Sequence, residues 1–190
     1  RDLHSFPTRR SSDLVVFSGT GTLNVTGNYK HAIACDDYIV MDQATINATS
    51  TAGNGIKVGE GMWIDGGILN INVTADGGRG IRCDFVVEIS GGTTTINTSG
   101  DCVYDDEAQE YSSAACIKCN DEFNMTGGTL EMKSTGDGGK GIKCGAVITF
   151  SGGTLIATTT GSKYRYSSSA TASPKAIKSD GAMTISGGTV

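Results

Sequence analysis

The sequence predicts an all-β fold, a right-handed, single-stranded parallel β-helix of about six coils, each 23–25 residues long. The first observation is a repeat, in which an Ile-Lys or Ile-Arg step is followed, ten residues after the Ile, by a Gly pair. The second is the alternation of apolar and polar residues within each repeat, which is typical of strands. The third is a composition with 28 Gly, 2 Pro and 6% aromatic residues, which favours short strands and tight turns.

The two ends of the chain set the limits of the predicted β-helix. Residues 4–14 read HSFPTRRSSDL, which resembles the translation of a sequencing-adapter oligonucleotide. Residues 1–14 are therefore interpreted as an adapter-derived artefact, and the β-helix is predicted over residues 15–190. The last four residues open a further repeat, so we expect that this segment is a fragment lacking at least its C-terminal end.

The spacing of the repeats predicts where loops leave the coils. Successive Ile residues are separated by 23, 25, 36, 25 and 35 residues, so two coils carry about ten extra residues just before the Ile. A solenoid tolerates such insertions at one corner, because each coil contacts only its neighbours. We therefore expect both insertions on the same side. The repeats are aligned on Ile33, Ile56, Ile81, Ile117, Ile142 and Ile177.

Alternation within a repeat predicts which side chains form the core. We expect every second residue after the Ile to face inward, as in the series Ile142, Cys144, Ala146, Ile148 and Phe150. Phe85 and Asp121 occupy the Ala146 position in other coils. A second alternating run follows each Gly pair, as at Leu69, Ile71 and Val73.

The cysteines fall into two groups. Four of them follow the Ile by two residues and are predicted to stack as buried thiols inside the coils, namely Cys35, Cys83, Cys119 and Cys144. Cys102 and Cys116 instead flank the first insertion. They either form a disulfide that closes this loop or remain free, and the sequence leaves both alternatives open.

A column of basic residues directly follows the Ile column and is predicted to face outward. Like charges about 4.8 Å apart repel one another, so they need anionic partners. One interpretation pairs them with Asp36, Asp84, Asn120 and Asp180, two residues further on. The other places an acidic polysaccharide along the column. The predicted ligand-binding residues of this column are Lys57, Arg82, Lys118, Lys143 and Lys178.

A column of acids and a group of tyrosines are predicted near the corner where the insertions leave. Asp76, Asp101 and Asp137 occupy equivalent turn positions, and Asp105 lies in the first insertion. Stacked carboxylates beside Gly-rich backbone are suitable calcium ligands, although nearby basic residues offer an alternative partner. Tyr104 and Tyr164 lie in the two insertions and are candidates for stacking on sugar rings.

Composition argues against two classes of partner. The formal net charge is −5, and no basic stripe is interleaved with aromatic residues, so nucleic-acid binding is not expected. No stretch approaches the roughly 18 apolar residues of a membrane helix, so we expect no membrane insertion.

The repeated GIK…ISGGT unit, clearest in residues 141–154 and 177–190, resembles the bacterial carbohydrate-binding β-helix family, which is similar in fold to pectate lyases. The resemblance implies a secreted or surface-exposed protein that binds acidic plant polysaccharide, typically polygalacturonate, with calcium. Our leading hypothesis is a non-catalytic binding domain of this kind. The alternatives are a polysaccharide lyase, with Arg82 or Lys118 as the base, and a structural stalk or adhesin domain.

Overall fold

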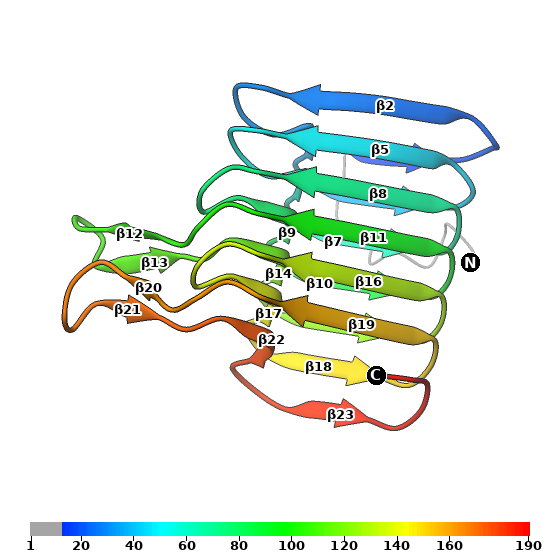
Figure 1. The fold of residues 1–190 in the computed structure, drawn as a ribbon. Coiled ribbons are helices and arrows are strands. Elements are labelled where there is room, and N and C mark those ends of the chain that lie inside the picture. Colours follow the sequence, from blue (N-terminus) through cyan, green and yellow to red (C-terminus); the bar gives the residue numbers. More distant parts are fainter. Residues whose placement is uncertain (1–12) are drawn as a thin grey trace.

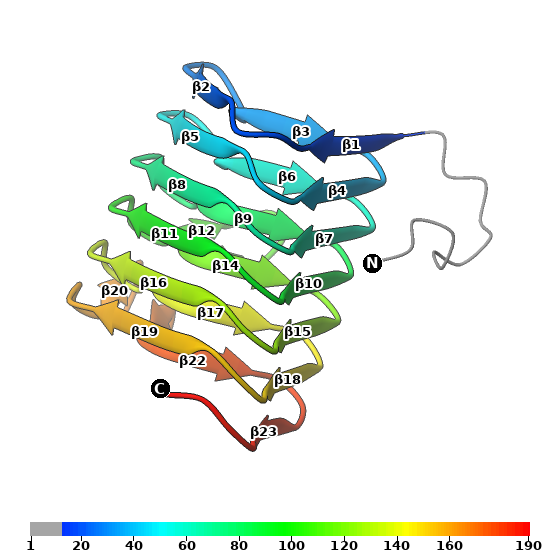
Figure 2. The ribbon, with the colours of Figure 1, turned by 90° about the vertical axis from the view of Figure 1, so that its right-hand side faces the viewer.

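The computed structural model describes residues 13–190, and all of its regular structure is β-strand. The first strand begins at Leu14 and pairs with the strand that contains Tyr38. The predicted artefact therefore lies outside the described residues except for Asp13 and Leu14. Three parallel sheets run along the stack, one on each side of the coils (Figures 1 and 2).

Each coil passes through the three sheets in the same order, which we call sheets A, B and C. Sheet A consists of β1 (Leu14–Phe17), β4 (Tyr38–Met41), β7 (Gly61–Ile64), β10 (Val86–Ile89), β15 (Glu122–Met125), β18 (Val147–Phe150) and β23 (Met183–Ile185). Sheet B consists of β2 (Thr22–Gly27), β5 (Thr45–Ser50), β8 (Ile68–Val73), β11 (Thr93–Thr98), β16 (Thr129–Ser134) and β19 (Thr154–Thr159). Sheet C consists of β3 (Ile33–Cys35), β6 (Ile56–Val58), β9 (Arg79–Cys83), β14 (Ala115–Cys119), β17 (Lys140–Cys144) and β22 (Lys175–Ser179). The prediction of an all-β parallel solenoid of about six coils is confirmed.

The register of sheet C confirms the alignment of the repeats. Ile81 pairs with Ile56 on one side and with Ile117 on the other, and the next partner of Ile117 is Ile142. Cys83, Cys119 and Cys144 stack in the same way. All of these side chains are buried in one continuous core that also takes side chains from sheets A and B. Burying one Leu- or Ile-sized side chain stabilises a fold by about 1.5–3 kcal/mol, so the stacked core holds the coils together.

The second glycine of each Gly pair is required by the turn from sheet A to sheet B. Its φ angle lies in the left-handed region, which side chains with a Cβ adopt at a cost. A Cβ on the first glycine would also lie within about 2.5 Å of a backbone oxygen of the preceding coil, as at Gly91 and Gly127. The left-handed glycines are Gly67, Gly92, Gly128, Gly153 and Gly188, with φ between 72° and 86°.

One part of the predicted core is wrong. The position occupied by Phe85, Asp121 and Ala146 was expected to face inward, yet Phe85 is 48% exposed and Asp121 is also exposed. These residues lie in the turn between sheets C and A, just before β10, β15 and β18. The strands end there, so the alternation of side chains does not continue through the corner.

The two insertions form antiparallel hairpins that leave the same corner, between sheets B and C (Figure 1). The first hairpin pairs β12 (Val103–Asp105) with β13 (Glu110–Ser112). The second pairs β20 (Tyr164–Arg165) with β21 (Thr171–Ala172). The prediction that the insertions line one side is confirmed, because the loops leave equivalent positions of stacked coils.

Candidate functional site: the basic face of sheet C

The predicted basic column is continuous on the outer face of sheet C. Lys57 pairs with Arg82, Arg82 with Lys118, and Lys118 with Lys143, followed by Lys178. Each of these side chains is half-buried between its neighbours. Because strands in a sheet lie about 4.8 Å apart, the charges form a regular row along the stack. We call these five residues the basic strip.

The members of the basic strip differ in their partners. Arg82 forms an ion pair with Asp84 at 3.4 Å, and Lys178 forms one with Asp180 at 2.6 Å. Asn120 donates a hydrogen bond to the same oxygen of Asp84 at 3.3 Å. Within residues 13–190, no carboxylate lies within ion-pair distance of Lys118 or Lys143. Internal pairing therefore accounts for only part of the strip.

The structure adds a second basic column that sequence reasoning did not assign to the site. Arg79 pairs with Ala115, Ala115 with Lys140, and Lys140 with Lys175, two residues before the Ile column. Strict alternation places these positions inside the coil. The residue between the Arg79 or Lys140 position and the Ile faces the core instead, as shown by Gly80, where a Cβ would lie 2.2 Å from the side chain of Ile96. The signal in the sequence is a small residue at this corner, as in Gly55, Gly80, Cys116, Gly141 and Ala176.

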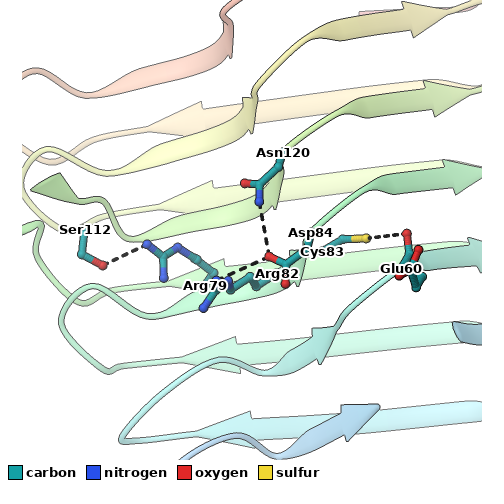
Figure 3. Close-up of polar contacts among 7 residues, drawn as sticks. All are labelled: Glu60, Arg79, Arg82, Cys83, Asp84, Ser112 and Asn120. Carbon is teal, nitrogen blue, oxygen red and sulfur yellow. Dashed lines mark hydrogen bonds and ion pairs between the residues drawn. The ribbon is translucent and has the colours of Figure 1, made fainter. Parts of the chain in front are cut away.

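The second basic column also anchors the hairpins to the coils. The Nη2 atom of Arg79 donates a hydrogen bond to Oγ of Ser112, in β13, at 2.9 Å (Figure 3). Lys140 is only 5% exposed, and its Nζ donates to the carbonyl oxygens of Gly138 at 2.6 Å and Ser173 at 3.1 Å. The loop bases are therefore held directly beside the basic strip.

Burial and mutual repulsion lower the pKa values of Lys118 and Lys143 on this face. Burial lowers the pKa of Lys118, and the charges of Arg79, Lys143 and Arg82 lower it further. Burial and then Lys178 and Arg79 do the same to the pKa of Lys143. A bound anion would oppose both causes, because it compensates the charge that desolvation and repulsion disfavour.

Of the two predicted tyrosines, Tyr104 lies in a ring cluster with Tyr111 and Tyr166 that joins the two hairpins. The Tyr104 ring lies 4.8 Å from the Tyr111 ring and 4.7 Å from the Tyr166 ring, measured between centroids. Tyr166 also donates a hydrogen bond to Asp106 of the first hairpin. Tyr164 is half-buried at the base of the second hairpin. Stacking of Tyr104 and Tyr164 on sugar rings stays a prediction, but two other rings already contact Tyr104.

The predicted acidic column exists, and its carboxylates bind the backbone of the next coil. Asp76 accepts the N–H of Asp101 at 2.8 Å, and Asp101 accepts the N–H of Asp137 at 2.7 Å. Asp137 accepts the N–H of Ser162 at 2.6 Å. In each case one carboxylate oxygen is used by a backbone donor, which is a structural role that the sequence did not reveal.

The arrangement of these acids does not form a ready-made metal site. Asp105 accepts hydrogen bonds from the N–H groups of Glu107 and Ala108 within the first hairpin, at 3.0 and 3.1 Å. In the part of the chain that the structure describes, no group of three or more His, Cys, Asp or Glu side chains is placed to hold a metal ion. Calcium binding therefore stays a prediction, and no role in the site is derived from it.

The two cysteines beside the first insertion are free thiols that face different environments. Cys116 contacts Thr98 at 3.7 Å and lies in the core of the coils. Cys102 contacts Ser113 at 3.9 Å, at the base of the first hairpin. The structure therefore contains no disulfide that closes this loop.

A family model for carbohydrate-binding domain-containing proteins matches residues 10–104 and residues 80–190. The chain belongs to this family. Membership in the carbohydrate-binding domain family assigns the protein a carbohydrate-binding role and agrees with the family resemblance of the repeats. Searches among curated proteins and among solved structures gave no match. Within residues 13–190, the structure has no helix with the length and apolar character needed to cross a membrane.

Proposed function

We propose that this carbohydrate-binding domain binds an acidic polysaccharide, such as polygalacturonate, along the outer face of sheet C. The observation that carries the proposal is the pairing of Lys118 with Lys143 in adjacent coils, with no carboxylate of residues 13–190 at ion-pair distance from either. Two adjacent cations that form no ion pair within residues 13–190 gain most from a polymer that supplies anions at regular intervals.

The distribution of charge supports an anionic ligand. The whole chain has a net charge of −5, yet two columns of basic residues share one face. Such segregation raises the local concentration of anions and steers them towards that face. A neutral polysaccharide would gain nothing from it, so charge complementarity favours a uronic-acid polymer or another acidic glycan.

The hairpins give the face a boundary on one side. Their bases are fixed to Arg79 and Lys140 of the second basic column, and their tyrosines project from the same corner of the stack. Aromatic rings on rigidly anchored loops suit the apolar faces of sugar rings. A glycan chain on the basic strip would therefore meet cations beneath it and aromatic side chains beside it.

Retention on polygalacturonate gels tests the proposal directly. We expect the protein to be retained at low salt and released as salt screens the charges. The double variant Lys118→Glu/Lys143→Glu should lose retention, whereas Lys133→Glu, on the outer face of sheet B, should not. Urea unfolding of each variant checks that the fold is intact. Equal retention of the wild-type protein and the double variant would refute binding on this face, and no retention of the wild-type protein would favour a purely structural domain.

Two further measurements refine the proposal. Incubation with soluble polygalacturonate, followed by ultraviolet absorbance of an unsaturated product, distinguishes a lyase from a binding domain. We also propose an extracellular or surface location, since an acidic plant cell-wall polymer is found only outside the cell that would bind it. Accessibility of an epitope tag on intact cells that express the full-length protein tests the location.

A further inference from the structure

The middle of the basic face brings together cations from consecutive coils. Arg79, Arg82, Lys118 and Lys143 come from the three consecutive strands β9, β14 and β17. Lys118 interacts electrostatically with each of the other three. By contrast, Lys178 near one end of the face has its own carboxylate partner, Asp180, at 2.6 Å. Of the central four cations, Arg82 forms an ion pair with Asp84, and the other three form none within residues 13–190.

Two donors in this central cluster make no hydrogen bond within residues 13–190. They are the Nε atoms of Arg79 and Arg82, which are shielded from solvent. Figure 3 shows Arg79 held by Ser112 and Arg82 held by Asp84. A shielded donor that makes no hydrogen bond is costly, so residues 13–190 do not satisfy all the hydrogen-bonding capacity of these two guanidinium groups.

Ala115 separates Arg79 from Lys140 in the second basic column and is fully buried. Its side chain ends at Cβ, so it places no further charge between the two neighbouring cations. Lys118 lies one coil after Arg82 and three residues after Ala115, on the same strand. The cations of both columns therefore lie on consecutive strands of one sheet face.

We propose that Arg79, Arg82, Lys118 and Lys143 form a subsite for one oxyanion group of the glycan, either a carboxylate or a sulfate ester. This inference rests on the proposed function and deepens it, because it assigns the strongest contact of the polymer to strands β9, β14 and β17 of sheet C. Guanidinium groups match the geometry of both anions and bind them through paired hydrogen bonds. The lysines add charge without fixed geometry.

Monosaccharides test the subsite without the polymer. The probes are sodium galacturonate, galactose 6-sulfate and neutral galactose, titrated into labelled protein while backbone amide NMR signals are followed, since NMR detects weak binding. We expect both acidic sugars to shift the amides of β9, β14 and β17 and galactose to shift none. The acidic sugar that reaches half-saturation at the lower concentration identifies the preferred oxyanion.

Two variants and one control make the result specific. Lys118→Met, which removes a side chain with no ion-pair partner among residues 13–190, should weaken binding of the acidic sugar about tenfold, as loss of one charge-assisted hydrogen bond predicts. Arg79→Gln should do the same, and Lys133→Met on sheet B should have no effect. Equal shifts with galactose, or unchanged binding by Lys118→Met and Arg79→Gln, would overturn the subsite. Continued retention of the wild-type protein on polygalacturonate in that case would leave the proposed function intact.

Discussion

Asp101 accepts the backbone N–H of Asp137, one coil further along, through its carboxylate at 2.7 Å. The same bond joins Asp76 to Asp101 and Asp137 to Ser162. A conspicuous column of acids therefore connects the coils at the corner where the hairpins leave.

Replacing the central acid should weaken the stack. Asp101→Ala leaves the N–H of Asp137 without its acceptor, and we expect a loss of about 1–2 kcal/mol in the free energy of unfolding. Urea denaturation followed by circular dichroism measures the change. Asp42→Ala, an exposed turn acid without a side-chain hydrogen bond in the described part of the chain, is the control. Equal stability of both variants would show that the bond contributes nothing.

Calcium binding at the same column is open to a direct titration. If Asp76, Asp101 and Asp137 bind calcium through their remaining oxygens, millimolar calcium should raise the melting temperature, and a chelator should reverse the increase. The increase should be smaller in Asp101→Ala. Melting curves that superimpose with calcium and with chelator would contradict the prediction.

Lys140 should make stability depend on pH in the alkaline range. Burial, opposed in part by Cys102, lowers its pKa from 10.5 to about 8. Between these two pH values the unfolded chain binds more protons than the folded one, so the free energy of unfolding should rise as pH increases from about 8 to 10.5. Below about pH 8 both states bind this proton, so the contribution of Lys140 no longer changes with pH.

The Lys140 contribution is isolated by difference. Lys140→Met removes the titrating group, so the stability of the wild-type protein relative to this variant should increase across that range. Urea unfolding at several pH values measures both. Other basic residues titrate in both proteins and cancel in the comparison. A constant difference between the two proteins would show that Lys140 keeps its ordinary pKa.

The six cysteines should be unreactive in the native protein. All are buried, and burial raises the pKa of Cys83 to about 12 and that of Cys116 to about 11, whereas a hydrogen bond with Cys119 lowers the pKa of Cys144 to about 7. Because every thiol is shielded from solvent, an aromatic disulfide reagent should react slowly at neutral pH, including with Cys144. After unfolding in urea without reductant, all six should react. Reaction of only four would reveal a disulfide between Cys102 and Cys116.

The tyrosine cluster should hold the two hairpins together. Tyr104 contacts Tyr111 and Tyr166, and each aromatic pair contributes about 0.5–1.5 kcal/mol beyond buried area. Tyr104→Ala should therefore speed proteolytic cleavage within the hairpins while leaving the unfolding of the coils unchanged. Tyr29→Ala, at a residue that is 94% exposed, serves as the control. Cleavage at equal rates in both variants would argue against the cluster.

The sequence by itself determined the stack of coils. A repeat that aligns Ile81, Ile117 and Ile142 can bury these side chains only if the coils lie in register, because a shift of one residue would turn the whole row outward. The basic strip follows from the same alignment, since Lys118 and Lys143 come directly after their Ile residues. The side on which the hairpins leave follows from the position of the extra residues.

Only the tertiary structure decided what the corners do. Alternation of side chains holds along a strand and fails where the strand ends, so Phe85 turned outward and Arg79 and Lys140 joined the basic face. Asp101 became a backbone acceptor because its partner belongs to the next coil and is far away in the sequence. Contacts of this kind depend on how the chain bends between strands, which the alternation of residues along a strand does not record.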